Sequence, residues 1–208
     1  MLPIFGIMVL TTNRKGISKM NKIKTSTLVK RRYNERLKGF DKALAVSQGA
    51  VRAHSGRLFE DMVVDVADSV NALALKGDDD MLHPTIGDNT KNLQVDKHIF
   101  RNGERHSFVE CKTYLDASFL ARAVLNFMEI NTTLDNADVE FGILAGQNAV
   151  AQETLDYYNA LLKHYTGKTM HVWFVNDVNK RVSSKPIAEY RFGLDMNEVQ
   201  SFIDFLSE

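Results

Sequence analysis

The sequence of 208 residues contains a single cysteine, Cys111. One cysteine excludes an internal disulfide framework and a zinc site built from several cysteines. Such a low content fits a reducing compartment, and we therefore expect a cytoplasmic protein. The apolar stretch at residues 1–10 is too short for a bilayer-spanning helix, which needs about 20 residues. It also lacks a preceding basic region, so we expect neither a signal peptide nor a membrane partner.

Several common catalytic motifs are absent from the sequence. It has no glycine-rich phosphate loop and no G-x-S-x-G nucleophile elbow, and its six histidines lack the spacing of a helical metal site. There is no internal repeat and no low-complexity tract. The candidate chemical groups that remain are carboxylates and lysines.

Charge is balanced overall but divided unevenly along the chain. Residues 1–57 carry 13 lysines and arginines against two acids, and residues 58–208 carry 13 against 24. We interpret residues 1–40 as a basic N-terminal arm and residues 41–208 as a single domain. Basic side chains attract phosphates without reading sequence. The candidates for DNA contact in the arm are Lys30, Arg31, Arg32 and Arg36, although a solvated face gives the same pattern.

The spacing of apolar residues predicts an α/β protein. Helical spacing covers residues 41–75, with breaks expected near Gly49 and Gly56 and a longer helix from Arg57 through Leu73 and Ala74. Further helices are predicted at residues 115–130, 150–165 and 197–206, and strands at residues 93–100, 106–112, 139–145 and 170–175. Strands that alternate with helices in the second half imply a mixed β-sheet with parallel pairing there, flanked by helices on both faces.

Residues 94–113 contain the strongest chemical signal in the chain. Asn102-Gly103 predicts a hairpin turn, and strand alternation places Glu110 and Lys112 on one face. With a plain two-residue loop, Asp96 pairs with Val109 and faces away from Glu110. We therefore predict an irregularity, either a three-residue loop with a bulge or a bend at Asp96, that brings the two carboxylates together.

Two carboxylates and a lysine at one place suit phosphodiester hydrolysis. Mg²⁺ takes one or two carboxylates and completes its octahedron with water and phosphate oxygens. Asp96 and Glu110 are the candidate ligands, and Lys112 would orient and acidify the attacking water or hold a phosphate oxygen. Cys111 points to the opposite face and is interpreted as a buried apolar residue.

The order Asp96, then Glu110-Cys111-Lys112 on a strand pair followed by a helix, resembles the PD-(D/E)XK nuclease superfamily, and within it the type II restriction endonucleases. Val95 stands where many members have proline. The resemblance implies a restriction-endonuclease-like fold (αβββαβ), Mg²⁺ bound by Asp96 and Glu110, a water assisted by Lys112, and products with 5′-phosphate ends. Glu60, on the preceding helix, occupies the position of a further acid that supports the metal in many members.

The function predicted from these residues is Mg²⁺-dependent cleavage of double-stranded DNA at a specific site. Cutting both strands of a palindrome calls for a homodimer. Ser118 and Arg122 share a polar face with Asn126 on the predicted helix at residues 115–130 and are further candidates for DNA contact. Arg122 could instead stabilise Glu110. Two alternatives are a repair or junction-resolving nuclease of the same fold and a non-catalytic nucleic-acid-binding protein.

Overall fold

A five-stranded mixed sheet forms the centre of the computed structural model, which describes residues 19–38, 48–86, 88–135, 138–177 and 193–208. In spatial order its strands are β1 (Leu73–Lys76), β4 (Lys97–Arg101), β5 (Glu104–Leu115), β6 (Glu140–Asn148) and β7 (Met170–Phe174). The pairs β1–β4 and β4–β5 are antiparallel, and β5–β6 and β6–β7 are parallel. A separate hairpin joins β2 (Thr85–Ile86) to β3 (Asn89–Thr90).

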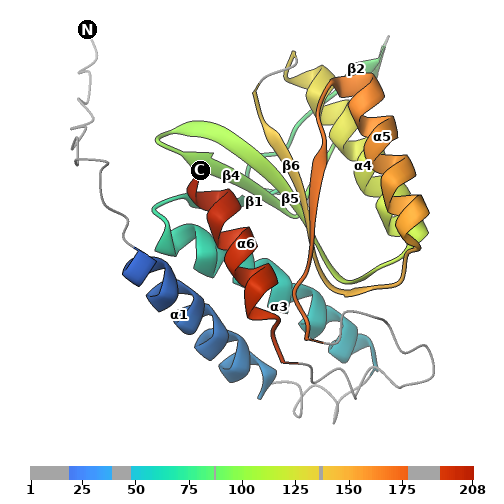
Figure 1. Ribbon diagram of the computed structural model, residues 1–208. Coiled ribbons are helices and arrows are strands. Elements are labelled where there is room, and N and C mark those ends of the chain that lie inside the picture. Colours follow the sequence, from blue (N-terminus) through green and yellow to red (C-terminus); the bar gives the residue numbers. More distant parts are fainter. Residues whose placement is uncertain (1–18, 39–47, 87, 136–137, 178–192) are drawn as a thin grey trace, which may run out of the picture.

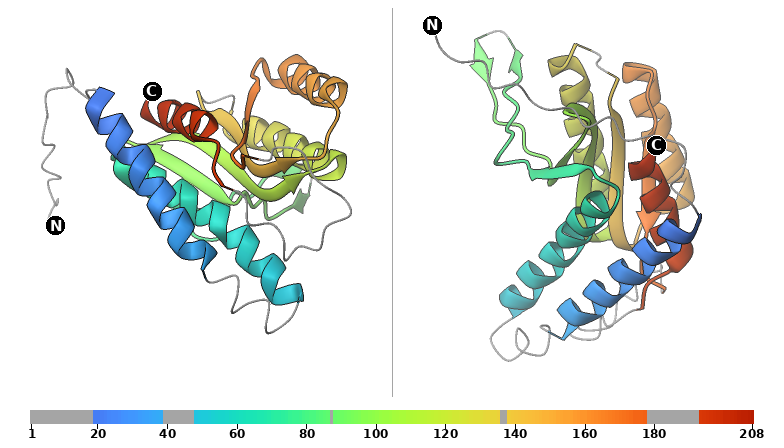
Figure 2. Two further views of the ribbon diagram at one scale, coloured as in Figure 1. Left: turned by 60° about the horizontal axis from the view of Figure 1, so that its bottom comes forward. Right: turned by 90° about the vertical axis from the view of Figure 1, so that its left-hand side faces the viewer.

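Helices cover both faces of the sheet (Figures 1 and 2). One face carries α1 (Lys19–Leu37), α3 (Gln48–Ser69) and α6 (Met196–Ser207), and the other carries α4 (Ala117–Thr133) and α5 (Gln152–Thr166). The predicted mixed sheet, its parallel second half and its two helical layers are therefore confirmed.

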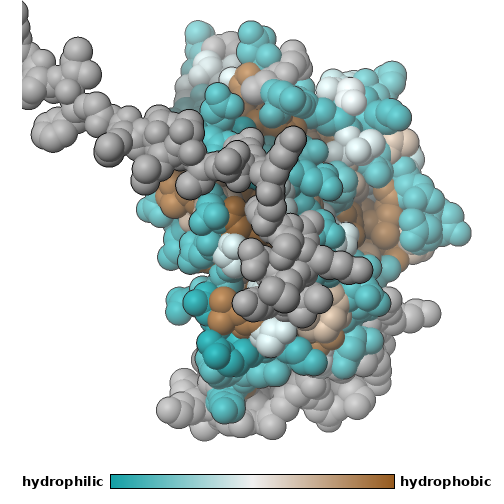
Figure 3. Space-filling view, turned by 60° about the vertical axis from the view of Figure 1, so that its left-hand side comes forward, coloured by the Kyte–Doolittle hydropathy of each residue, from teal (hydrophilic) through white to brown (hydrophobic). Residues whose placement is uncertain are grey.

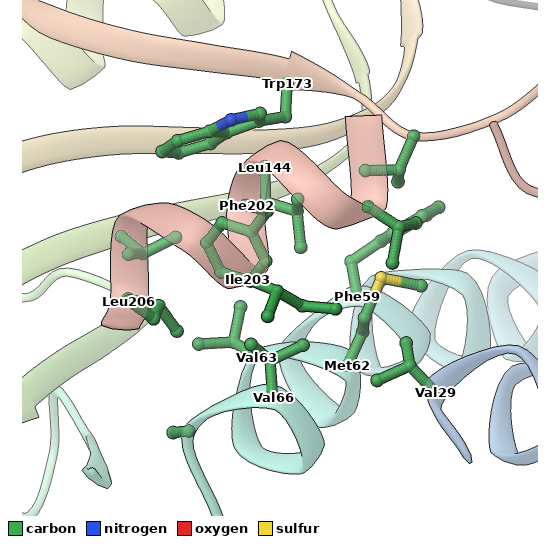
Figure 4. Packing of buried hydrophobic residues seen from close by; sticks show 14 of the residues in the cluster. Val29, Phe59, Met62, Val63, Val66, Leu144, Trp173, Phe202, Ile203 and Leu206 are labelled. Carbon is green, nitrogen blue, oxygen red and sulfur yellow. The ribbon is translucent and has the colours of Figure 1, made fainter. Parts of the chain in front are cut away.

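Each face of the sheet has its own apolar core. On the α3 side, Phe59 and Val63 of α3 meet Phe202 of α6 and Trp173 of β7, as Figure 4 shows. Burying one such side chain contributes about 1.5–3 kcal/mol relative to leaving it in water. At Gly146 of β6 a Cβ would lie 2.7 Å from the ring of Phe59, so the close approach of α3 to the sheet requires glycine there.

Two predictions about α3 are wrong. The helix runs through Gly56 without a break, and it ends at Ser69 although the apolar stripe continues to Leu73 and Ala74. Its end is set by Asn71, which adopts a left-handed φ of 58°. The N–H of Ala72 then donates to the carbonyl of Ala67, which closes the helix as a Schellman motif. Leu73 and Ala74 follow as part of β1.

Helix α1 belongs to the same folded unit as the sheet. Its Val29 and Tyr33 are buried in the core shared with α3 and α6, so the predicted boundary at residue 40 does not separate an arm from a domain here. Two arginines of α1 also pair with Asp65 of α3, whose side chain is 5% exposed: Arg32 Nη1 and Arg36 Nη1 each lie 2.5 Å from one of its oxygens. Residues 1–18 and 39–47 lie outside the described residues.

Hydrophilic side chains dominate the face seen in Figure 3, with small hydrophobic patches between them. Among the described residues, no helix is both long enough and apolar enough to cross a membrane.

We expect the Asp65 ion pairs to hold α1 in place. Replacing both Arg32 and Arg36 by alanine leaves a buried carboxylate without a partner, which should lower the free energy of unfolding by about 3 kcal/mol. The matched control replaces Lys30 and Arg31, two exposed cations of the same helix, and should cost less than about 1 kcal/mol. Urea unfolding measures both; equal losses would contradict this role for Asp65.

Candidate active site

The predicted hairpin is formed by β4 and β5 around a two-residue turn. Asn102 and Gly103 both have positive φ, 53° and 85°, which is the backbone of a type I′ turn. Arg101 pairs with Glu104 on either side of the turn. The sequence therefore encodes this turn locally, through two residue types that tolerate the left-handed region.

An irregularity in the ladder changes the register, as predicted. Phe100 pairs with Arg105 but Ile99 pairs with Ser107, so one residue of β5 is bulged out at position 106. Beyond the bulge Lys97 pairs with Val109. The next pair of positions is Asp96 and Glu110, which would not lie opposite each other in a regular ladder. Asp96 also lies at a bend just before β4.

The shifted register brings Asp96, Glu110 and Lys112 together in what we call the carboxylate–lysine cluster. Lys112 Nζ lies 2.9 Å from Asp96 Oδ2 and 2.8 Å from Glu110 Oε2. The backbone N–H of Cys111 donates to the same oxygen of Asp96 at 2.8 Å. β4 begins at Lys97, so the N–H of Cys111 lies beyond the end of the β4–β5 ladder, and the carboxylate of Asp96 supplies its acceptor. Asp96 is the most open member at 30% side-chain exposure, against 8% for Glu110.

The three charges of the cluster control one another. Burial raises the pKa of Glu110, and the charge of Asp96 adds to the rise against the opposing effect of Lys112. Burial acts in the same direction on Asp96, but Lys112 and the hydrogen bonds from its neighbours lower the pKa of Asp96 overall. Burial opposes the charge on Lys112, yet the two carboxylates raise the pKa of Lys112 above its ordinary value. The lysine is therefore a cation that can donate to a water or phosphate oxygen.

The cluster fits the needs of a small divalent cation. Two carboxylates close enough to shift each other's pKa gain from a shared positive charge, and Mg²⁺ is bound through one or two carboxylates plus water and substrate oxygens. Within the described parts of the chain, no group of three or more histidine, cysteine or acidic side chains has the geometry to hold a metal ion. Asp96 and Glu110 are the two carboxylates of the cluster, so they are the side chains that could hold such an ion, with solvent or substrate completing its shell.

Helix α4 supplies a contact that the sequence analysis did not assign to the site. Asp116 caps α4 directly after β5 by accepting from the N–H of Phe119 at 2.9 Å, so α4 turns back along β5 without a connecting loop. Asn126 then donates from Nδ2 to Glu110 Oε1 at 3.3 Å. In the sequence, the signal for this contact was the position of Asn126 on the polar helix face that it shares with Ser118 and Arg122. Stabilising Glu110 was one alternative for Arg122, and the structure gives this contact to Asn126.

Glu60 is held by a different partner from the one predicted. Its Oε2 lies 3.5 Å from Nζ of Lys97, a side chain that is 3% exposed. Lys97 pairs with Val109, so both point to the α3 face, whereas Glu110 and Lys112 point to the α4 face. The structure therefore does not join Glu60 to the two carboxylates of the cluster.

The predicted DNA-contacting residues fall into two groups. Those on α1 lie on the α3 face of the sheet, where Arg32 and Arg36 are engaged with Asp65 while Lys30 and Arg31 are exposed. Ser118 and Arg122 are exposed on α4, the helix that borders the carboxylate–lysine cluster. Only the second group is on the same face as the cluster.

A second polar group lies on the same strands. His98 is fully buried; its Nδ1 lies 2.8 Å from Asp80 Oδ2, and Arg105 Nη2 donates to that oxygen at 2.6 Å. The ring of His98 packs edge-on against Phe108 at 4.7 Å. Burial lowers the pKa of His98, with Asp80 acting against the shift. The neutral ring, with its proton on Nδ1, is the form that the fold stabilises.

We expect this histidine to make stability fall in mild acid. Its folded pKa is lower than the unfolded value of about 6.5, so its contribution is complete above about pH 6.5 and is lost as the pH falls towards the folded value. His98→Asn keeps an N–H donor near Asp80 but does not titrate. Between pH 7.5 and 5.5, urea unfolding should show a smaller loss of stability for the variant than for the wild type, and parallel losses would refute the assignment.

We expect Asn126 to orient Glu110 for metal binding. Removing a hydrogen-bond partner of a metal-binding carboxylate typically reduces metal affinity about 10–100-fold. Asn126→Ala should therefore weaken Mg²⁺ or Mn²⁺ binding by calorimetry by at least about tenfold. Thr132→Ala, an exposed change on the same helix, is the control. Equal affinities for the two variants would show that the 3.3 Å contact is incidental.

Comparison with known proteins does not assign this chain to a family. No protein-family model matches the sequence, and no curated protein matches it.

Proposed function

We propose that this chain is a Mg²⁺-dependent nuclease that hydrolyses phosphodiester bonds of double-stranded DNA, most like a type II restriction endonuclease. The observation that carries the proposal is the convergence of Asp96, Glu110 and Lys112 through a bulged hairpin. A flat ladder would have separated the two carboxylates. Instead, both lie within 3 Å of the lysine nitrogen, with Asp96 partly open to solvent.

The order of elements around the cluster supports the same proposal. Along the chain, α3, β1, β4, β5, α4 and β6 run in the order αβββαβ, which is the order that the resemblance implies and therefore supports the proposal. The hairpin β2–β3 is an insertion outside the main sheet. Glu110 and Lys112 stand on the third of these strands and Asp96 directly precedes the second, an arrangement that supports the resemblance.

The residues of the cluster would divide the reaction between them. Mg²⁺ held by Asp96 and Glu110 would polarise the phosphodiester and acidify the attacking water. Lys112 would donate to that water or to a phosphate oxygen and offset the negative charge that builds up on the phosphate. The water oxygen bonds to phosphorus as the bond to the 3′ oxygen breaks. A proton leaves the water for solvent and another reaches the 3′ oxygen, so the products are a 5′-phosphate and a 3′-hydroxyl.

Cleavage of both strands at a two-fold symmetric site would require two copies of the cluster, which a homodimer provides. We propose this assembly together with a cytoplasmic location as parts of the restriction function. Ser118 and Arg122, beside the cluster on α4, are better placed for DNA contact than the cations of α1.

Lys112→Met should abolish most Mg²⁺-dependent cleavage of plasmid DNA. The variant keeps the length of the side chain but loses its charge and donors, and loss of one such stabilising donor costs about 100-fold or more in rate. Lys163→Met, on the exposed side of α5, is the matched control and should cleave at the wild-type rate. Gel analysis of supercoiled plasmid with Mg²⁺ and with a chelator gives both rates.

The pattern of products separates the proposed function from its alternatives. Discrete fragments from one unmethylated plasmid support a restriction enzyme, whereas preference for branched DNA favours a junction-resolving or repair nuclease. Full cleavage by Lys112→Met would remove the lysine from the mechanism. Binding of DNA by a wild-type protein that never cleaves it would favour a binding protein without catalysis.

A further inference from the structure

The aromatic ring of Phe119 links the carboxylate–lysine cluster to an exposed arginine. Lys112 Nζ lies 5.9 Å from the centre of this ring, and the guanidinium carbon of Arg122 lies 5.0 Å from the same centre. Tyr114 packs edge-on against Phe119 at 5.9 Å, which supports the ring from the end of β5. Phe119 and Arg122 are one turn apart on α4, so their relative position follows from the helix.

Arg122 has no acidic partner among the described residues, in contrast to three arginines elsewhere in the fold. Arg32 and Arg36 are neutralised by Asp65, and Arg105 by Asp80. The guanidinium of Arg122 instead lies over Phe119 on an exposed part of α4. Asn126, one turn further along α4, makes the contact to Glu110 in place of Arg122. The positive charge of Arg122 is therefore available to an anion beside the cluster.

The spacing of the two cations fits a nucleic-acid backbone. Because Lys112 and Arg122 lie close to one ring, their charges are at most about 11 Å apart, the sum of the two distances to its centre. Successive charges on a DNA strand rise by about 3.4 Å along the helix axis and also wind around it, so neighbouring phosphates are farther apart than this rise but on the scale of the upper limit for the two cations. A guanidinium suits phosphate because its N–H groups form two parallel hydrogen bonds.

We propose that Arg122, positioned on Phe119, binds the phosphate next to the one that is cleaved. The substrate is then a polynucleotide strand with at least two consecutive phosphates, not an isolated phosphodiester. This inference rests on the proposed function, because it takes the carboxylate–lysine cluster as the place of cleavage. It assigns to α4 a binding subsite that is separate from the metal-binding carboxylates.

The first test compares two substrates that differ in their number of phosphates. For Arg122→Ala, kcat/KM for a DNA duplex should fall about tenfold more than kcat/KM for bis(p-nitrophenyl) phosphate, which has no second phosphate. Arg122→Lys should recover part of the loss on DNA. Lys163→Ala, which removes an exposed cation from α5, should change neither value. Equal losses of Arg122→Ala on both substrates would overturn the subsite.

The second test measures DNA binding without cleavage. In the Lys112→Met background, fluorescence anisotropy of a labelled duplex gives the dissociation constant as a function of salt concentration. Adding Arg122→Ala should reduce the slope of log K against log salt by about one, the value for one lost phosphate contact. An unchanged slope would refute the phosphate contact. If the wild type neither binds nor cleaves DNA, the proposed function fails and this inference fails with it.

Discussion

One bulged residue in the β4–β5 hairpin determines where every potential catalytic group stands. Side chains along a strand alternate between the two faces of the sheet. The extra residue at position 106 therefore shifts the pairing of β4 with β5 by one residue for all positions farther from the turn. Asp96 thereby comes opposite Glu110 and accepts a hydrogen bond from the N–H of Cys111. Lys112, two residues after Glu110, then lies between both carboxylates.

The short connection from β5 to α4 fixes the position of the helix, as the bulge fixes the register of the strand. Asp116 begins α4 one residue after β5 ends, which fixes how the helix lies along the strand. As a result Asn126 reaches Glu110 and Phe119 reaches Lys112 from the same helix. The side chains around the cluster thus depend on two local backbone features, a bulge and a helix cap, and both occur within one continuous segment of chain.

Local signals predicted most of the elements, and the failures have identifiable physical causes. Asn102-Gly103 and the alternation of Glu110 and Lys112 are encoded in neighbouring residues, so the hairpin and the need for an irregularity were predictable. The exact place of the bulge was not, because any of several positions restores the register. Helical spacing extended α3 to Leu73 and Ala74, but the left-handed backbone of Asn71 ends the helix first. Gly56 costs a helix about 1 kcal/mol, which the apolar contacts of α3 offset. The partners of Arg32, Arg36 and Glu60 lie far away in sequence and required the tertiary structure.

Asp96 is held by the backbone of residue 111 and not by its side chain. Its donor is a backbone N–H, which every residue except proline provides, so the cysteine side chain takes no part in holding the carboxylate. That side chain points into the α3 core, and burial raises the pKa of the Cys111 thiol well above its ordinary value. A buried, protonated thiol reacts poorly with oxidants and alkylating reagents. The cysteine side chain is therefore not needed to hold Asp96, and alanine or serine at position 111 would keep the same N–H donor.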